Sequence, residues 1–170
     1  MKRNNSFPRE REISPVETTP GKNSPRQRET TTKRRGELAE LAFILKARTL
    51  GFSLAKPFGD SERYDFIVDS GKDLWRIQVK STTTVLNGRY HVNSHRRTNG
   101  NVVAYDPSEI DFLVAYIIPE DAWFILPIQA ILARTSLLFC FKDDPKGGLY
   151  GAYREAWNLM RDPIEIWTVP

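Results

Sequence analysis

Two strand-like segments separated by a short polar turn constrain the fold of this chain most strongly. The segments read RYDFIVD and LWRIQVK, and residues 69–73 between them are typical of the tight connection in an antiparallel hairpin. Side chains alternate between the two faces of a strand, so residues two apart point the same way. In the second segment the apolar positions are Trp75, Ile77 and Val79, and the polar positions are Arg76, Gln78 and Lys80. The pattern therefore predicts a hairpin with one apolar and one polar face.

One acidic residue, Asp65, interrupts the first segment, which is otherwise apolar or aromatic from Tyr64 to Val68. Aspartate is uncommon inside strands, so its presence needs a reason. The predicted hairpin places Asp65 beside the face that carries Gln78 and Lys80. We therefore expect these three side chains to form one polar cluster.

A glutamate on the preceding helix, Glu40, is the fourth candidate for this cluster. Residues 36–50 have helical spacing, and Gly51 is a plausible stop. The helical neighbours of Glu40 three, four and seven positions on are Phe43, Ile44 and Ala47. A carboxylate above such an apolar row is costly to bury unless something neutralises it, whereas Glu37 suits the ordinary role of a first-turn acid. Glu40 is thus the better candidate.

The residue types of the cluster indicate a chemistry. Taken singly, a helix glutamate is usually solvated, an aspartate at a strand end often caps a turn, and a strand lysine is usually surface charge. Together, three oxygen-bearing side chains and one lysine suit a hard divalent cation beside a phosphodiester. The cluster therefore favours a protein that cuts nucleic acid.

The segment that carries the cluster, KRRGELAELAFILKARTLGFSLAKPFGDSERYDFIVDSGKDLWRIQVKS at residues 33–81, resembles the PD-(D/E)XK nucleases with the restriction-endonuclease-like fold. A weaker likeness continues through residues 105–128. The closest likeness is to the branch with a cyanobacterial group I intron homing endonuclease, and archaeal Holliday-junction resolvases are more distant. In this family a helix glutamate, a hairpin aspartate, and an acid and lysine on the second hairpin strand form the active site.

The resemblance implies a catalytic set of Glu40, Asp65, Gln78 and Lys80. Gln78 departs from the pattern, because most members carry Glu or Asp there, although the intron-encoded branch carries Gln. The resemblance also implies Mg²⁺, with Mn²⁺ able to substitute, held by Asp65, Gln78 and the Val79 backbone carbonyl, with Glu40 acting directly or through water. Lys80 would position or deprotonate the attacking water. DNA hydrolysis would leave a 5′-phosphate and a 3′-hydroxyl.

Two alternatives from other classes stay open. The same fold could serve as a DNA-binding module that has lost cleavage, for which Gln78 is the only hint in the sequence. The polar cluster could also be an ion-pair network in a structural or regulatory protein, with Lys80 neutralising Asp65.

The excess positive charge of the chain lies in its first 35 residues. Residues 1–35 hold ten Lys/Arg and four Asp/Glu, a net +6, whereas the other 135 residues hold fifteen and seventeen, a net −2. Residues 1–33 are poor in apolar side chains and predict a disordered basic arm that contacts phosphates, or a merely solvated extension. A second basic cluster falls at residues 87–101, which we interpret as a DNA-binding loop or a plain exposed one. The candidate DNA contacts are Lys33, Arg34, Arg35, Arg89, His95, Arg96 and Arg97.

The remainder of the chain reads as scaffold for an α/β domain, with a central mixed sheet flanked by helices. Residues 34–142 form the predicted nuclease-like core, with strands at 111–118, 122–126 and 137–142 and a short helix within 127–135. Residues 143–170 supply a C-terminal helix, at 150–160, and a tail that pack on the core or a partner subunit. Trp157 and Trp167 make a homo-oligomer, a dimer or tetramer, plausible.

The cellular setting follows from what the sequence lacks. The sequence has no run of about eighteen apolar residues, so we expect no membrane-spanning helix. The N-terminus has no apolar signal region, and the single cysteine, Cys140, cannot form an internal disulfide. We therefore expect a cytoplasmic protein.

Overall fold

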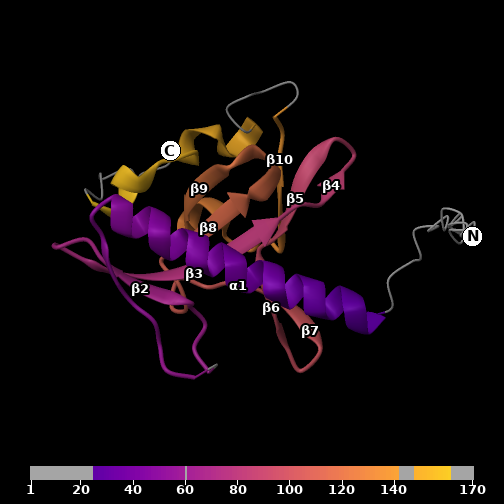
Figure 1. Cartoon of the computed structure of the whole chain (residues 1–170), viewed down its shortest axis with the longest axis horizontal. Helices are drawn as coiled ribbons and strands as arrows, with labels where there is room; N and C mark the ends of the chain where they lie inside the picture. Colours follow the sequence, from indigo (N-terminus) through magenta and orange to yellow (C-terminus); the bar gives the residue numbers. More distant parts are fainter. Residues whose placement is uncertain (1–24, 60, 142–147, 162–170) are drawn as a thin grey trace, which may run out of the picture.

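The protein folds around one mixed β-sheet with a long helix across it (Figure 1). The computed structural model describes residues 25–59, 61–141 and 148–161. The main sheet has the order β1-β2-β3-β8-β9. Its helix and strands are α1 (Pro25–Thr49), β1 (Ser53–Ala55), β2 (Phe66–Asp69), β3 (Leu74–Thr82), β8 (Phe112–Ile117) and β9 (Ala122–Pro127). Within these described ranges, no helix is both long and apolar enough to cross a membrane.

Two smaller sheets complete the β structure. The first has the order β10-β5-β4 and the second pairs β6 with β7. Their strands are β4 (Val85–Leu86), β5 (Arg89–Asn93), β6 (His95–Thr98), β7 (Asn101–Ala104) and β10 (Ser136–Phe139). Short 3₁₀ turns connect or follow the strands: η1 (Ile118–Glu120), η2 (Ile128–Ile131), η3 (Gly148–Tyr153) and η4 (Trp157–Met160).

The predicted hairpin is confirmed. Strands β2 and β3 pair antiparallel, with Phe66 opposite Ile77. Strand β3 pairs in parallel with β8 on its other side, and β8 pairs antiparallel with β9. The predicted fold class, an α/β domain built on a central mixed sheet, is therefore confirmed.

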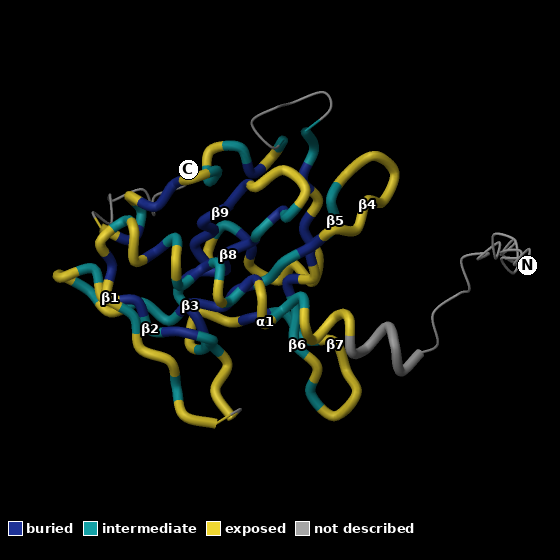
Figure 2. The backbone as a smooth tube through the Cα atoms, in the orientation of Figure 1, coloured by how far each residue is buried: buried dark blue, intermediate teal, exposed yellow. Residues whose placement is uncertain are grey.

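The main sheet has an apolar layer on each face, because its central strands are buried on both sides (Figure 2). On β8, Phe112 and Val114 pack in the cluster that includes Phe43 of α1. The alternate residues Leu113 and Ala115 pack in a second cluster with residues of β5 and β10. Helix α1 therefore covers one face of the sheet and the β10-β5-β4 sheet covers the other.

Strand β3 is longer than its hairpin partner, and this difference prepares the site. The β2–β3 register ends at Phe66 and Ile77, followed by a hydrogen bond from the Asp65 N–H to the Ile77 carbonyl at 2.8 Å. Beyond that point β3 continues to Thr82 and pairs with β8 alone. The outer edge of β3 from Gln78 onward is therefore open to side chains.

The N-terminal and central predictions need correction. Helix α1 begins at Pro25 rather than near Gly36, so residues 25–33 of the predicted arm are helical. The Arg, Gln and Glu residues there favour a helix without an apolar face. Residues 1–24 lie outside the described residues. The predicted loop at 87–101 contains β5, β6 and the start of β7, because β5 pairs with the distant strand β10 and buries Val92.

The predicted helix at residues 150–160 is also wrong. The segment forms η3 and η4, separated by Glu155 in a left-handed conformation at φ 51°. The Glu155 N–H donates to the Trp123 carbonyl at 2.7 Å, which ties the segment to β9. Trp157 and Met160 are buried in the core of the chain itself, while Trp167 lies outside the described residues.

The aromatic cluster under α1 yields a test of the fold. The Phe43 ring lies 5.3 Å from Phe66, 6.2 Å from Trp123 and 6.0 Å from Trp157, centroid to centroid. We expect Phe43→Ala to lower the free energy of unfolding by about 3–5 kcal/mol, because it leaves a cavity in a fully buried site. Leu41→Ala, on the exposed side of the same helix, should change it by less than about 0.5 kcal/mol. Similar losses in chemical denaturation would contradict this packing.

Candidate active site

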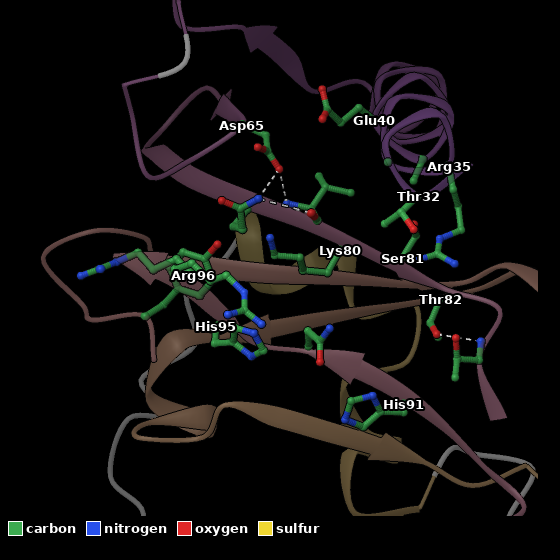
Figure 3. A pocket seen from close by; sticks show the side chains of 18 residues that line it. Thr32, Arg35, Glu40, Asp65, Lys80, Ser81, Thr82, His91, His95 and Arg96 are labelled. Carbon is green, nitrogen blue, oxygen red and sulfur yellow. Dashed lines mark hydrogen bonds between the residues drawn. The ribbon is translucent and has the colours of Figure 1, made fainter. Parts of the chain in front are cut away.

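The Asp65 carboxylate organises the polar cluster at the open edge of β3. Its Oδ2 accepts the Val79 backbone N–H at 2.8 Å and the Gln78 Nε2 at 2.5 Å. The side chain thus occupies the place that a neighbouring strand would take beside Val79. Figure 3 shows these bonds as dashed lines, with Asp65, Glu40 and Lys80 around one space.

The Gln78 side-chain amide donates hydrogen bonds to a carboxylate oxygen and to a backbone carbonyl oxygen. Besides its bond to Asp65, the Gln78 Nε2 donates to the Val79 carbonyl at 3.3 Å. The residue is 7% exposed, so the amide has little water to bond. The amide nitrogen therefore lies between a carboxylate oxygen and a carbonyl oxygen.

Lys80 is two residues beyond Gln78 and shares its face of β3. Its Nζ lies 5.6 Å from the centroid of the Tyr105 ring, and Tyr105 is buried at the end of β7. Burial lowers the pKa of Lys80, while the Asp65 and Glu40 carboxylates raise it. The ring and the two acids thus oppose the loss of the positive charge.

Glu40 reaches the cluster from α1. It is half-buried and lines the same cavity as Asp65, whereas Glu37 is exposed. The Glu40 Oε2 forms an ion pair with Lys56 at 2.7 Å. Lys56 thus supplies the neutralising partner that a carboxylate over an apolar row requires.

Burial is the main influence on Asp65 as well. It raises the pKa of the Asp65 carboxyl, and the nearby Glu40 charge raises it further. The hydrogen bond from Val79, the Lys80 charge and the Gln78 amide lower the same pKa. A second positive charge in the cluster would therefore stabilise both carboxylates.

All four predicted catalytic side chains line one cavity of about 570 Å³. Its other walls come from the N-terminal half of α1, the end of β3, and strands β5 and β6. The predicted DNA contacts Arg35, His95, Arg96 and Arg97 also line it. The other three, Lys33, Arg34 and Arg89, are exposed but do not line it.

Arg96 is held by an acidic side chain of the chain itself. Its guanidinium forms an ion pair with Glu109 at 2.6 Å and also bonds the Thr98 hydroxyl. The His95 Nδ1 lies 2.7 Å from the Thr135 carbonyl oxygen. These contacts hold the base of the β6–β7 hairpin, so Arg96 has a structural role that the sequence did not suggest.

Sequence reasoning missed several residues of the cavity. His91 and Asn93 line it because they share one face of β5, and the alternation along residues 89–93 is the signal that could have identified this strand in place of the predicted loop. Tyr105 had no local signal, since its position under Lys80 depends on how β7 returns to the sheet. Thr82 and Thr84 also line the cavity.

The donors at the cavity floor are hard oxygens. In the described ranges no group of three or more His, Cys, Asp or Glu side chains could hold a metal ion. The available set instead combines the Asp65 and Glu40 carboxylates with the Val79 carbonyl and the Gln78 amide. Oxygen donors of these mixed types suit Mg²⁺, which commonly takes one or two carboxylates and keeps waters.

The mixed sheet and the helix across it have the arrangement of a restriction-endonuclease-like α/β fold. A sequence profile described as PD-(D/E)XK endonuclease matches residues 30–158, and the chain belongs to this family. Members of the family generally use divalent metal ions.

Among solved structures, the chain is similar to a bacterial homing endonuclease, I-Ssp6803I. The TM-score is 0.68 and the sequence identity 31%, over 76% of this chain and 93% of that chain. No curated protein matches the sequence significantly.

The contact between Lys80 and Tyr105 can be tested by unfolding. We expect Tyr105→Leu to lower the free energy of unfolding by about 1–2 kcal/mol, because it removes the ring beneath the ammonium. Tyr105→Phe keeps the ring and should change it by less than about 0.5 kcal/mol, since no hydrogen bond of the hydroxyl is present within the described residues. Equal losses in the two variants would assign the effect to the hydroxyl instead.

Proposed function

We propose that this protein is a divalent-metal-dependent endonuclease that hydrolyses DNA phosphodiester bonds. The observation that carries the proposal is the convergence of Glu40, Asp65, Gln78 and Lys80 on one cavity. These residues come from a helix and both sides of a hairpin, and the chain belongs to a nuclease family. Hydrolysis would leave a 5′-phosphate and a 3′-hydroxyl.

The cation would be held by Asp65, Gln78 and the Val79 carbonyl, with Glu40 as a direct or water-mediated ligand. Asp65 Oδ2 and the Val79 oxygen both lie within hydrogen-bond distance of the Gln78 Nε2. Rotating the amide exchanges this nitrogen for an oxygen, which then faces two other oxygens. Such a set accommodates a cation and is repulsive without one. When bound, Mg²⁺, or Mn²⁺ in its place, lowers the pKa of a bound water and neutralises phosphate charge.

Lys80 supplies the positive charge of the chain itself at the reaction centre. Its ammonium can bind a phosphate oxygen and offset the negative charge that develops during in-line attack. Burial also lowers the pKa of Lys80, so the neutral form that could take a proton from an attacking water is easier to reach than for an exposed lysine. Both roles need the side chain to stay over Tyr105.

The cavity walls provide the means to hold DNA. Arg35 on α1 and His95 and Arg97 on β6 lie on different sides of the catalytic cluster. The Arg35 guanidinium suits bidentate contacts with phosphate, and DNA backbone contacts of this type give salt-sensitive affinity. Two such sites in one assembly would cut both strands of a duplex together, so we propose a homo-oligomer, a dimer or tetramer.

A cleavage assay tests the proposal with variants matched on the same helix. Supercoiled and branched DNA should be cut with Mg²⁺ and left intact in EDTA. We expect Lys80→Ala to reduce the rate about 10²-fold or more, because it removes charge stabilisation in a water-poor site. Glu40→Ala should also reduce it, whereas Glu37→Ala should leave it unchanged.

Cleavage that persists in EDTA or in the Lys80→Ala variant would contradict this mechanism. Tight DNA binding without cutting under any condition would favour the second candidate, a binding module that has lost cleavage. Its specific support is Gln78, which contributes no charge where most family members place an acid.

Metal binding by Gln78 can be measured without catalysis. We expect Gln78→Glu to lower the free energy of unfolding in EDTA by about 2 kcal/mol, because it replaces a donor to Asp65 with a second carboxylate. Excess Mg²⁺ should raise the Tm of this variant more than that of the unmodified protein.

The matched control is Gln129→Glu, which adds the same charge at an exposed position. It should respond to Mg²⁺ as the unmodified protein does. An equal Mg²⁺ response in Gln78→Glu would place residue 78 outside the reach of the cation.

A further inference from the structure

The β6–β7 hairpin is a separate structural unit beside the candidate site. It forms its own two-stranded sheet and protrudes from the body of the protein (Figure 1). Asn99 and Gly100 make the turn, with φ of 50° and 80°. Two consecutive positive φ values at Asn-Gly are typical of the tightest hairpin turn, so the tip is narrow and well defined.

The two faces of the hairpin differ in what they contact. Arg96 and Val103, opposite each other on one face, line a cavity together with Tyr105 and Glu109, and the Arg96–Glu109 ion pair ties that face to the body. His95 and Arg97, on the other face, line the cavity of Asp65 and Lys80, which Arg96 also reaches. The hairpin is therefore anchored at its base, by Arg96 on one face and His95 on the other, and it presents the face of His95 and Arg97 toward the candidate site.

The presented face ends in an exposed pair of unlike side chains. Arg97 lies opposite Val102 in the register, and Arg97 is exposed. Val102 is 48% exposed, so its side chain is accessible beside the Arg97 guanidinium. Asn101 is also exposed but belongs to the opposite face, with Thr98 as its partner in the register.

The dimensions of the hairpin fit a groove of double-stranded DNA. Each strand has four residues, which at about 3.3 Å per residue gives a ribbon roughly 13 Å long. The major groove is about 8.5 Å deep and about 12 Å wide, enough to admit a two-stranded ribbon. A duplex whose backbone enters the neighbouring cavity would bring its groove to this ribbon.

We propose that the β6–β7 hairpin reads base pairs in the major groove beside the cleaved phosphodiester, with Arg97 and Val102 as specificity-determining residues. Arginine forms bidentate hydrogen bonds with guanine, and an apolar side chain contacts the methyl group of thymine. This inference rests on the proposed function. It assigns base recognition to the hairpin and leaves phosphate binding to the other basic residues.

Selection from a pool of duplexes with randomised base pairs tests the assignment. The full chain carrying Lys80→Ala, which blocks cutting, selects DNA, and the bound sequences are compared among further variants. Arg97→Ala should reduce discrimination at one or two base pairs about tenfold or more, and Val102→Ala should reduce it at a neighbouring pair. Asn101→Ala, on the opposite face, should retain the original preference.

Arg89→Ala is the control for a phosphate contact, because Arg89 is an exposed, positively charged side chain on β5 that does not line the cavity. It should weaken all sequences alike and reduce the salt dependence of binding. The same uniform loss in Arg97→Ala, or a parent protein that binds DNA but selects no sequence, would overturn the assignment to the hairpin. A parent protein that binds no DNA would instead overturn the proposed function, which the cleavage assay checks separately.

Discussion

The hydrogen bond from the Val79 N–H to the Asp65 carboxylate is the contact on which the candidate site depends. Strand β2 stops pairing with β3 at Phe66, so the edge of β3 opens where its central side chains emerge. The Asp65 carboxylate accepts a hydrogen bond from the Val79 N–H at that edge, and the same oxygen accepts one from the Gln78 side-chain amide. A sheet edge that would otherwise need another strand thereby becomes a place where ligands can reach backbone and side-chain oxygens together.

The buried charges that the candidate site needs lower the stability of the fold. Burial raises the pKa of Asp65 and lowers that of Lys80, so both charged forms lose solvation on folding. Helix α1 contributes to both effects. Its Glu40 lines the cavity of the buried charges, while its Phe43 packs with three aromatic rings and so stabilises the core. Strained or poorly solvated functional groups commonly persist where surrounding packing holds them in place.

Local pattern was enough to predict the hairpin, the shared face of Gln78 and Lys80, and the position of Glu40, rather than Glu37, beside them. Each of these depends on residues close in sequence and on the periods of strands and helices. The β5–β7 region could not be predicted in the same way, because β5 pairs with β10 across a long separation. Tyr105 and the Glu109 partner of Arg96 likewise depend on tertiary packing, and the left-handed Glu155 broke a helix that side-chain spacing alone favoured.

The anchoring of the β6–β7 hairpin at its base has a consequence for how this chain can change over evolutionary time. Its base is held by Arg96, Glu109 and the Thr135 carbonyl, while the residues around its turn are exposed. Substitutions there leave the aromatic core and the Asp65 cluster untouched. Exposed positions beside the turn, such as Arg97 and Val102, can therefore diversify between lineages, while the Asn99-Gly100 turn and the packed interior change slowly.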